Sequence, residues 1–296
     1  MEKNNSQSTK YQALSAKLSF AFFGTPDLVI PILDELEKSG LLPSLIVTGP
    51  DKAKGRKLVV APPSPKVWAE KRKIKVLQPE KINKTFIDDF QKNNFDLAVV
   101  VAYGKILPRT LLNAPKYGML NVHYSLLPKY RGATPVESAI LAGDKETGVC
   151  IQQMAFALDV GDIVDEEKTE IRDGEKAPEL RARLNEMAKI MLPKAISKIE
   201  GSQTTFKKQE DAKATYCKKI KKEDGLIKLE EDGLSNYLKF RAYFGWPGTY
   251  FFTEKSDKQI RIKITDASFS NGEFKILKVI PEGKKEMDYE DFKRGL

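Results

Sequence analysis

The sequence predicts an α/β protein with a mostly parallel, Rossmann-like sheet in its N-terminal part and a small antiparallel β unit at its C-terminus. Two patterns predict this architecture. Up to about residue 199, short apolar runs alternate with segments of helical spacing, which indicates right-handed βαβ crossovers and helices on both faces of a sheet. After about residue 206, short alternating runs separated by turn residues favour antiparallel strands, as in an open barrel.

The first strand is predicted at Leu18–Phe23, an apolar run that ends at Gly24. Pro26–Lys38 follows with apolar residues at helical spacing, and Gly40 can cap this helix. A second strand is predicted at 45–48. The turn after the first strand lacks both the glycine pattern of dinucleotide-binding folds and the Walker lysine, so the sequence supports neither NAD nor ATP binding.

The rest of this half continues the alternation. The run Leu97–Val101, within a strand predicted at 96–102, is the strongest candidate for a strand buried on both faces. A long helical pattern over 176–199, interrupted or ended near Pro193, closes the half. Further helices are predicted at 65–73 and 80–94, and further strands at 75–77 and 149–154. An apolar strand is also predicted at the start of the segment 118–132.

Three strand-like runs carry the C-terminal pattern: Tyr250–Phe252, Ile260–Ile264 and Phe274–Ile280. Ser256-Asp257 and Asn271-Gly272 supply turns between them. The change of pattern predicts a domain boundary. We therefore expect a flexible tail at 1–17, a first domain at 18–206 and a second domain at 207–296.

The composition excludes several classes of protein. Lys and Arg total 50 against 41 Asp and Glu, so the formal net charge is +9, which suits an anionic partner. Two cysteines and a single histidine exclude a disulfide scaffold and a zinc site rich in those residues, so we expect no metal. No run approaches the ~18 apolar residues of a membrane span, and the polar start lacks the apolar core of a secretory signal. We expect a cytoplasmic protein without a membrane partner.

The segment from Gly118 to Gly132 is the richest in groups that could carry chemistry. Asn121 and His123 are two positions apart on a predicted strand, so their side chains point to the same face. Ligands of open α/β sheets bind beyond the carboxyl ends of strands. An amide donor beside an imidazole there suits stabilisation of a developing oxyanion, with His123 moving a proton. The alternative is a histidine whose hydrogen bonds are satisfied at a strand end.

A second polar cluster, Leu158–Asp162, follows the strand predicted at 149–154. A carboxylate there could orient or charge the only histidine, although Asp159 and Asp162 are also common turn residues. The chain has no Gly-x-Ser-x-Gly pattern that would supply a nucleophile. The attacking group would therefore come from a substrate.

Positive charge is concentrated in two segments. Residues 51–75 hold nine Lys or Arg against two acidic residues, and residues 213–222 hold five lysines and no acidic residue. Either segment could be a solvated face, but one in each predicted domain favours a phosphate backbone as partner. Pro50–Lys57 is interpreted as a mobile basic loop rather than a regular element.

From about residue 18 to 296 the chain resembles the methionyl-tRNA formyltransferase family. The run Asn-x-His-x-Ser-Leu-Leu-Pro is typical of enzymes that use 10-formyltetrahydrofolate. Other matching segments surround it. The full set is Phe22–Pro26, Gln78-Pro79, Val101–Pro108, Asn121–Pro128, Tyr130–Pro135 and Leu158–Asp162.

Two further similarities concern the formyl acceptor. Pro50–Leu58 is similar to the family's basic tRNA-binding loop, although Ala53 stands where the family has a proline and Lys57 follows the matching arginine. Ala214–Ile220 and Trp246–Gly248 are similar to the family's C-terminal oligonucleotide-binding-type barrel. The resemblance therefore implies an OB-like, tRNA-binding second domain.

The resemblance also implies an activity, in which the formyl group of the co-substrate 10-formyltetrahydrofolate passes to the α-amine of methionyl-initiator tRNA for translation initiation. It implies that Asn121 and His123 hold the oxyanion, while Asp159 positions or charges His123. The residues that the resemblance implies for folate binding are Ser125, Leu126, Leu127 and Pro128. Those that we expect to bind tRNA are Lys52, Lys54, Arg56, Lys57, Lys218 and Lys219.

Two alternatives are weighed against this. A nucleotide-sugar N-formyltransferase or a formyltetrahydrofolate hydrolase domain would share the catalytic half, but the basic loop at 51–58 argues against a sugar, and the missing dehydrogenase extension against the hydrolase. A non-catalytic RNA-binding module would explain the charge but not the set Asn121, His123 and Asp159. We expect a monomer that binds initiator tRNA.

Overall fold

The computed structural model describes residues 18–54, 59–201, 203–255 and 258–296. The chain forms two compact units. Among the described residues, unit 1 holds 18–131, 148–167 and 182–215, and unit 2 holds 132–147, 168–181 and 216–296. The tail predicted at 1–17 lies outside the described residues, and the domain boundary predicted after residue 206 stays a prediction.

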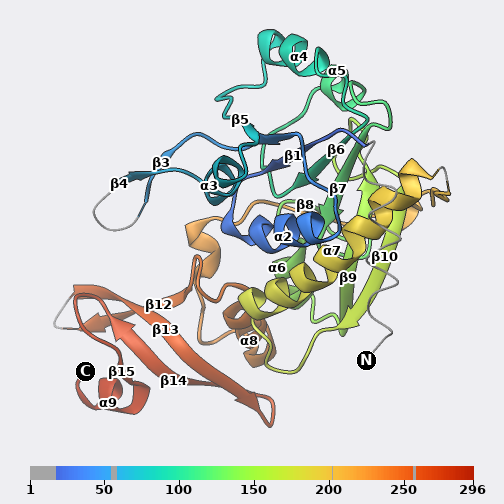
Figure 1. Ribbon diagram of the computed structural model, residues 1–296. Helices are drawn as coiled ribbons and strands as arrows, with labels where there is room; N and C mark the ends of the chain where they lie inside the picture. The colour runs from blue at the N-terminus through green and yellow to red at the C-terminus, as the bar shows by residue number, and fades with distance from the viewer. Residues whose placement is uncertain (1–17, 55–58, 202, 256–257) are drawn as a thin grey trace, which may run out of the picture. The chain divides into compact units, whose positions relative to one another are not determined.

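One large sheet is built from β1 (Phe20–Gly24), β2 (Leu45–Val47), β5 (Lys75–Leu77), β6 (Leu97–Val101), β7 (Met119–His123), β9 (Glu146–Gln153) and β10 (Ile163–Glu170). The strands lie in the order β10-β9-β7-β6-β1-β2-β5 (Figure 1). β1, β2, β5, β6 and β7 pair in parallel, whereas β9 is antiparallel to β7. The predicted mostly parallel α/β sheet is confirmed.

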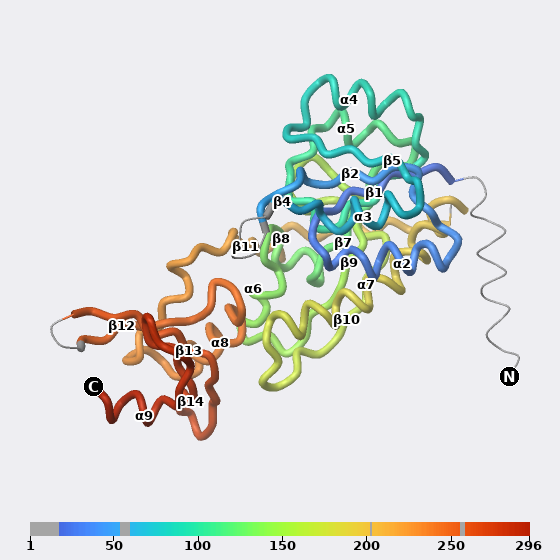
Figure 2. Tube along the Cα trace, turned by 60° about the vertical axis from the view of Figure 1, so that its left-hand side comes forward, coloured from blue at the N-terminus to red at the C-terminus, as the bar shows by residue number. Residues whose placement is uncertain are grey.

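The helices beside this sheet are α2 (Ile30–Lys38) with its leading 3-10 turn η1 (Asp27–Val29), α3 (Ser64–Lys71), α4 (Lys84–Gln91), α5 (Arg109–Leu112) and α7 (Ala177–Glu200). Helices α4 and α5 lie on one face of the sheet, and α2, α3 and α7 lie on the other (Figures 1 and 2). The sheet is thus covered on both faces, as the alternation of strands and helices predicts.

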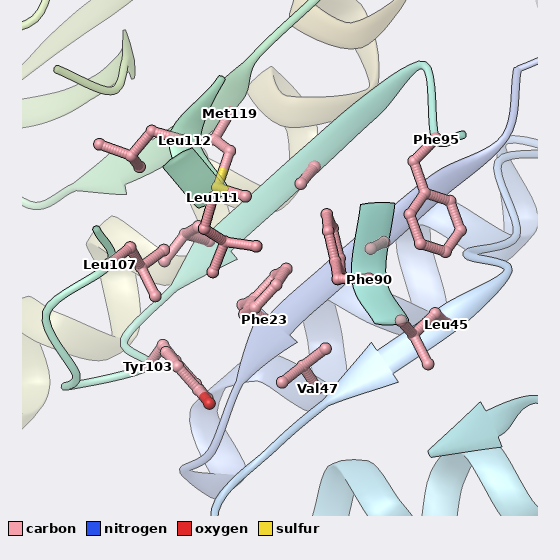
Figure 3. Packing of buried hydrophobic residues seen from close by; sticks show 13 residues of the cluster. Phe23, Leu45, Val47, Phe90, Phe95, Tyr103, Leu107, Leu111, Leu112 and Met119 are labelled. Atoms are coloured by element: carbon pink, nitrogen blue, oxygen red, sulfur yellow. The ribbon is translucent and has the colours of Figure 1, made fainter. Parts of the chain in front are cut away.

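The core between the sheet and α4 and α5 shows why these strands were recognisable. Every residue of β1 is buried, and Ala21 and Phe23 pack with Phe90 of α4 and Leu111 of α5 (Figure 3). The Phe23 ring centroid lies 5.6 Å from that of Phe90 and 5.3 Å from that of Tyr103. Burial of one such side chain contributes about 1.5–3 kcal/mol. Strands buried on both faces must be apolar at every position, which gives continuous runs in the sequence.

Two helices differ from their predictions. The helix expected to be interrupted or to end near Pro193 runs unbroken as α7, because proline removes only one backbone donor and buried neighbours such as Leu192 hold the helix on the sheet. The helix predicted at 80–94 is limited to α4. Its start is fixed by Asn83, whose side chain accepts a hydrogen bond from the Phe86 N–H at 2.9 Å.

The basic segment after β2 is more regular than predicted. β3 (Lys52–Lys54) pairs antiparallel with β4 (Val59–Ala61), so the first part of the expected irregular loop is a strand. The β-branched Val59 and Val60 favour an extended partner strand. Residues 55–58, between the two strands, lie outside the described residues.

Unit 2 contains a four-stranded antiparallel sheet of β12 (Thr249–Lys255), β13 (Lys258–Ser270), β14 (Glu273–Pro281) and β15 (Met287–Asp288), in that order. The predicted small antiparallel β unit is confirmed. Phe251, Ile262 and Val279 of the sheet pack with Phe240 of α8 (Gly233–Ala242) and Phe292 of α9 (Tyr289–Arg294). Helix α8 was not predicted.

Short elements complete the fold. They are α6 (Pro135–Leu141), the strands β8 (Arg131–Gly132) and β11 (Tyr216–Cys217), which pair with each other, and the 3-10 turns η2 (Asp211–Lys213) and η3 (Lys222–Gly225). Within the described ranges, none of the helices combines the length and the apolar character needed to cross a membrane.

Candidate active site

Asn121 and His123 lie on β7 and face the same side of the sheet, as their spacing predicts. The antiparallel strand β9 places Gln152 opposite Asn121 and Cys150 opposite His123. Paired residues of antiparallel strands share a face, so these side chains converge. Across the part of the chain that the structure describes, no group of three or more His, Cys, Asp or Glu side chains could hold a metal ion.

His123 is held in one tautomer. Its Nε2 lies 2.9 Å from the carbonyl oxygen of Tyr130. A carbonyl oxygen only accepts, so Nε2 carries the proton and donates it, and in the neutral ring Nδ1 keeps its lone pair. Nδ1 faces Asp159, whose Oδ2 lies at 3.8 Å. The fold therefore presents Nδ1 as the basic atom of the site.

Asp159 reaches the site from the loop after β9. Its Oδ1 accepts a hydrogen bond from Gln152 Nε2 at 2.8 Å and lies 3.5 Å from Asn121 Nδ2, the outer limit of a hydrogen bond. Its backbone has φ +53°, in the left-handed region that is unfavourable for residues other than glycine. The fold thus brings Asp159 to His123, which sequence spacing alone could not establish.

The electrostatics of the pair decide what it can bind. Burial lowers the pKa of His123, while the Asp159 carboxylate and the hydrogen bond to the Tyr130 carbonyl act in the opposite direction. The imidazole is therefore neutral near pH 7. Neutral Nδ1 and Asp159 Oδ2 are both acceptors and face each other at 3.8 Å. Such a pair is suited to a ligand that carries donor hydrogens, and an amine is the simplest one.

Three residues of the site were missed by sequence reasoning: Gln152, Arg131 and Gln209. Gln152 directly follows the apolar run Val149–Ile151 in the sequence, a signal that could have identified it, and its side chain is 1% exposed. Arg131 is also 1% exposed and donates to Gln209 Oε1 from Nε at 3.0 Å. Gln209 Nε2 donates to the carbonyl oxygens of Asp159 at 2.9 Å and Gly161 at 2.6 Å. No local pattern marks Gln209, because its partners are distant in the sequence.

The segment predicted to contact a ligand, Ser125–Pro128, is only partly accessible. Ser125 is fully buried, and its Oγ donates to the Lys129 carbonyl at 2.6 Å. Leu127 belongs to a small buried cluster. Leu126 and Pro128 keep part of their surface exposed. The ligand contacts of this segment stay a prediction.

Three apolar side chains in loops of unit 1 are largely exposed to solvent and do not pack in its core. Ile106, in the loop between β6 and α5, is 89% exposed. Phe156 and Leu158, in the loop that carries Asp159, are 60% and 62% exposed. The guanidinium of Arg109, the first residue of α5, lies 5.1 Å from the centre of the Phe156 ring, so the Asp159 loop contacts the start of this helix. Exposed apolar side chains next to a polar cluster are typical of a ligand-binding surface.

The residues predicted to bind tRNA are divided between the two units and the residues that the structure leaves undescribed. Lys52 is exposed on β3, and its charge helps burial to lower the pKa of Lys105, so these two lysines are near one another. Lys218 and Lys219 are exposed in unit 2. The side chain of Lys54, and all of Arg56 and Lys57, lie outside the described residues.

Comparisons with known proteins agree with the sequence patterns. The profile of the formyl transferase family matches residues 16–196. A methionyl-tRNA formyltransferase of Citrifermentans bemidjiense is 38% identical, over 86% of this chain and 81% of the relative. Another, of Halalkalibacterium halodurans, is 37% identical over 94% of this chain and 95% of the relative.

Solved structures add a similarity of fold. An N-formyltransferase of Helicobacter canadensis, solved with folinic acid and dTDP-3-aminofucose, superposes with a TM-score of 0.64. It is 16% identical and the match covers 86% of this chain and 88% of that chain. At this level of identity the match supports the fold alone.

Proposed function

The chain belongs to the methionyl-tRNA formyltransferase family, and from this premise we propose how its residues carry out formyl transfer. The reaction moves the formyl group of 10-formyltetrahydrofolate to the α-amine of methionyl-initiator tRNA. The observation that carries our mechanism is the pair of acceptors, His123 Nδ1 and Asp159 Oδ2, which face each other at 3.8 Å. An attacking amine has donor hydrogens that can interact with both acceptors.

His123 takes the part of a general base. As the amine nitrogen forms its bond to the formyl carbon, Nδ1 accepts the proton that the amine loses. The Asp159 carboxylate stabilises the imidazolium that results. When the bond between the formyl carbon and the folate nitrogen breaks, the same proton passes to the leaving nitrogen. The protein itself needs no nucleophile.

Asn121 takes the part of the oxyanion donor. Its Nδ2 is only weakly engaged by Asp159, at 3.5 Å, so it can turn to the formyl oxygen as negative charge develops there. The Tyr130 carbonyl keeps the Nε2 proton of His123 in place during the reaction. The family resemblance implies that His123 also holds the oxyanion, but its Nε2 proton is donated to the Tyr130 carbonyl and its neutral Nδ1 only accepts. We therefore assign the oxyanion to Asn121 alone and proton transfer to His123.

We expect Asn121→Ala to lower kcat by about 10²-fold, the usual effect of removing one oxyanion donor. KM for folate and for tRNA should change little, since the donor acts on charge that develops in the transition state. Steady-state kinetics with both substrates measures this. Asn113→Ala, a change of the same kind outside the site, is the control. A kcat within about threefold of wild type would exclude Asn121 from the mechanism.

The ligand surfaces follow from exposure and charge. We assign folate contacts to the segment Ser125–Pro128, made through the partly exposed Leu126 and Pro128, while the buried Ser125 and Leu127 hold the segment in place. The exposed Ile106, Phe156 and Leu158 offer apolar surface for the planar part of the molecule. We assign phosphate contacts of tRNA to Lys52, Lys54, Arg56, Lys57, Lys218 and Lys219. We further propose that the enzyme is a monomer and acts in the cytoplasm, where initiator tRNA is used.

The proposed function has a direct test. Purified protein with 10-formyltetrahydrofolate that carries a labelled formyl group should label methionyl-initiator tRNA. Formylation of a nucleotide-linked amino sugar but not of the tRNA would contradict it and favour a sugar acceptor. Binding of the tRNA without any transfer would favour a non-catalytic RNA-binding module.

We expect Arg56→Ala to reduce transfer to tRNA about tenfold or more at physiological salt while folate binding is retained. An arginine can bind phosphate through two parallel hydrogen bonds, which a lysine cannot. Affinity for tRNA in the wild type should also fall as salt is added, because phosphate contacts release counterions. Titrations of both ligands across a salt series measure the two effects.

The matched control for this prediction is Lys92→Ala. It removes the same charge from an exposed side chain at the C-terminal end of α4. This position comes before β6, whereas the loops that carry ligand groups follow the C-terminal ends of the strands. Equal losses of folate and tRNA binding in Arg56→Ala would indicate misfolding. No loss of either would show that the basic segment is a solvated surface.

A further inference from the structure

Gln209 uses the full hydrogen-bonding capacity of its amide within the site. Its Oε1 accepts from Nε and Nη2 of Arg131, at 3.0 and 2.8 Å. Its Nε2 donates to the carbonyl oxygens of Asp159 and Gly161, at 2.9 and 2.6 Å. A side-chain amide has two donor hydrogens and two acceptor lone pairs, so this one side chain links two loops through four bonds.

The first of these loops contains the acceptor for His123. Arg131 directly follows Tyr130, whose carbonyl accepts from Nε2 of the histidine. The segment that carries Gln209 also holds the backbone here, because the Tyr130 N–H donates to Thr215 Oγ1 at 2.8 Å and the Arg131 N–H to the Thr215 carbonyl at 2.9 Å. Arg131 Nη2 also donates to Asp211 Oδ1 at 2.6 Å, so Gln209 holds the loop that sets the tautomer of His123 together with Asp211 and Thr215.

The second loop contains the carboxylate. Asp159 has φ +53°, a conformation that a residue other than glycine holds only when its surroundings enforce it. The loop has little room to relax, because a Cβ on Gly161 would lie 1.6 Å from the Gln153 carbonyl oxygen. Two hydrogen bonds from Gln209 to this strained loop are the type of constraint that the conformation requires.

We propose that Gln209 is a positioning residue of the formyl transfer. It fixes the position of the Tyr130–Arg131 loop relative to the Asp159 loop, so that His123 Nδ1 faces the Asp159 carboxylate. The inference rests on the proposed roles of His123 and Asp159. Gln209 itself touches neither reacting atom. Its effect passes through the distance and angle between the two catalytic side chains, to which rates are sensitive.

The variant Gln209→Glu distinguishes the bonds that Gln209 makes to Arg131 from those that it makes to the Asp159 loop. A glutamate still accepts from Arg131, whose guanidinium also keeps its ion pair with Asp211, but it no longer donates to the carbonyls of Asp159 and Gly161 and repels them instead. We expect kcat to fall about 10²-fold, the order of effect that a misplaced catalytic group produces, with both KM values within about threefold. Gln203→Glu, the same charge change at an exposed glutamine, should leave kcat unchanged.

A readout without substrate comes from the imidazole itself. The chain has one histidine, so the ¹⁵N signals of a single ring report the tautomer of His123 directly. We expect Gln209→Glu to reduce the population with the proton on Nε2, while the melting temperature stays close to that of Gln203→Glu. A purely structural role would lower the melting temperature without changing these signals.

A double-variant cycle completes the test. If Gln209 acts through Asp159, then Gln209→Glu should cost little further activity in a protein that already carries Asp159→Asn. Additive losses, or a wild-type kcat and imidazole spectrum in Gln209→Glu, would overturn the proposal. Should Gln209→Glu fail to fold, Gln209→Met, which removes all four bonds without adding charge, takes its place with the same expected loss. Failure of the wild type to formylate tRNA would instead count against the proposed function, and the NMR result would still stand.

Discussion

His123→Ala is expected to lower kcat by about 10³-fold or more, because the substitution removes the general base of the proposed mechanism and the group that returns the proton to the leaving nitrogen. His123 is buried, so truncation leaves a small cavity and removes the hydrogen bond to the Tyr130 carbonyl, and we expect a lower melting temperature. The protein should still fold, because the sheet strands around the site keep their own apolar core. Single-turnover formylation of methionyl-tRNA, with folate and tRNA affinities measured separately, gives the result.

The matched control is Cys150→Ala. Cys150 is buried opposite His123 on β9, and its Sγ accepts a hydrogen bond from the Leu127 N–H at 3.3 Å. Its truncation loosens the packing beside the histidine without removing a group that moves a proton. We expect a modest loss of stability and near wild-type kcat. If His123→Ala retained wild-type turnover in a folded protein, His123 would not be the base.

Asp159→Asn should reduce kcat about 10³-fold while leaving the loop nearly unchanged in shape, because an amide cannot stabilise an imidazolium as a carboxylate does. The sign of the accompanying pKa change is fixed by the electrostatics. The Asp159 charge raises the pKa of His123 against the effect of burial, so its removal should lower that pKa further. The acid limb of the pH–rate profile, where the base becomes protonated, should then move to lower pH.

NMR titration of the single histidine measures this shift without a kinetic model. Asp162→Asn, the same change three residues further along the chain, is the control, and we expect neither its kcat nor the pKa of His123 to change. An unchanged His123 pKa in Asp159→Asn would remove Asp159 from the site. A shift in Asp162→Asn instead would transfer the role to the second carboxylate.

The sequence was informative wherever one face or both faces of an element are buried. The runs at Phe20–Gly24 and Leu97–Val101 had to be apolar throughout, so their positions and their parallel arrangement could be predicted. Helix α7 was harder, because Pro193 is a general signal for a helix end and only its packing on the sheet shows that the helix continues. The strand at Lys52–Lys54 has no apolar pattern and became visible only through its pairing with β4.

What the sequence alone determined about the site was its chemistry: Asn121 and His123 share a face because strand side chains alternate, and the absence of a serine-type pattern pointed to a nucleophile supplied by a substrate. The tertiary structure decided how these groups are arranged. The approach of Asp159 to His123, the tautomer set by the Tyr130 carbonyl, and the bonds of Gln209 to two loops all join residues that are distant in the chain. Local propensity and periodicity describe residues that are neighbours along the chain. Contacts between residues that are distant in the chain form only when the sheet and its loops are folded, so only the tertiary structure shows them.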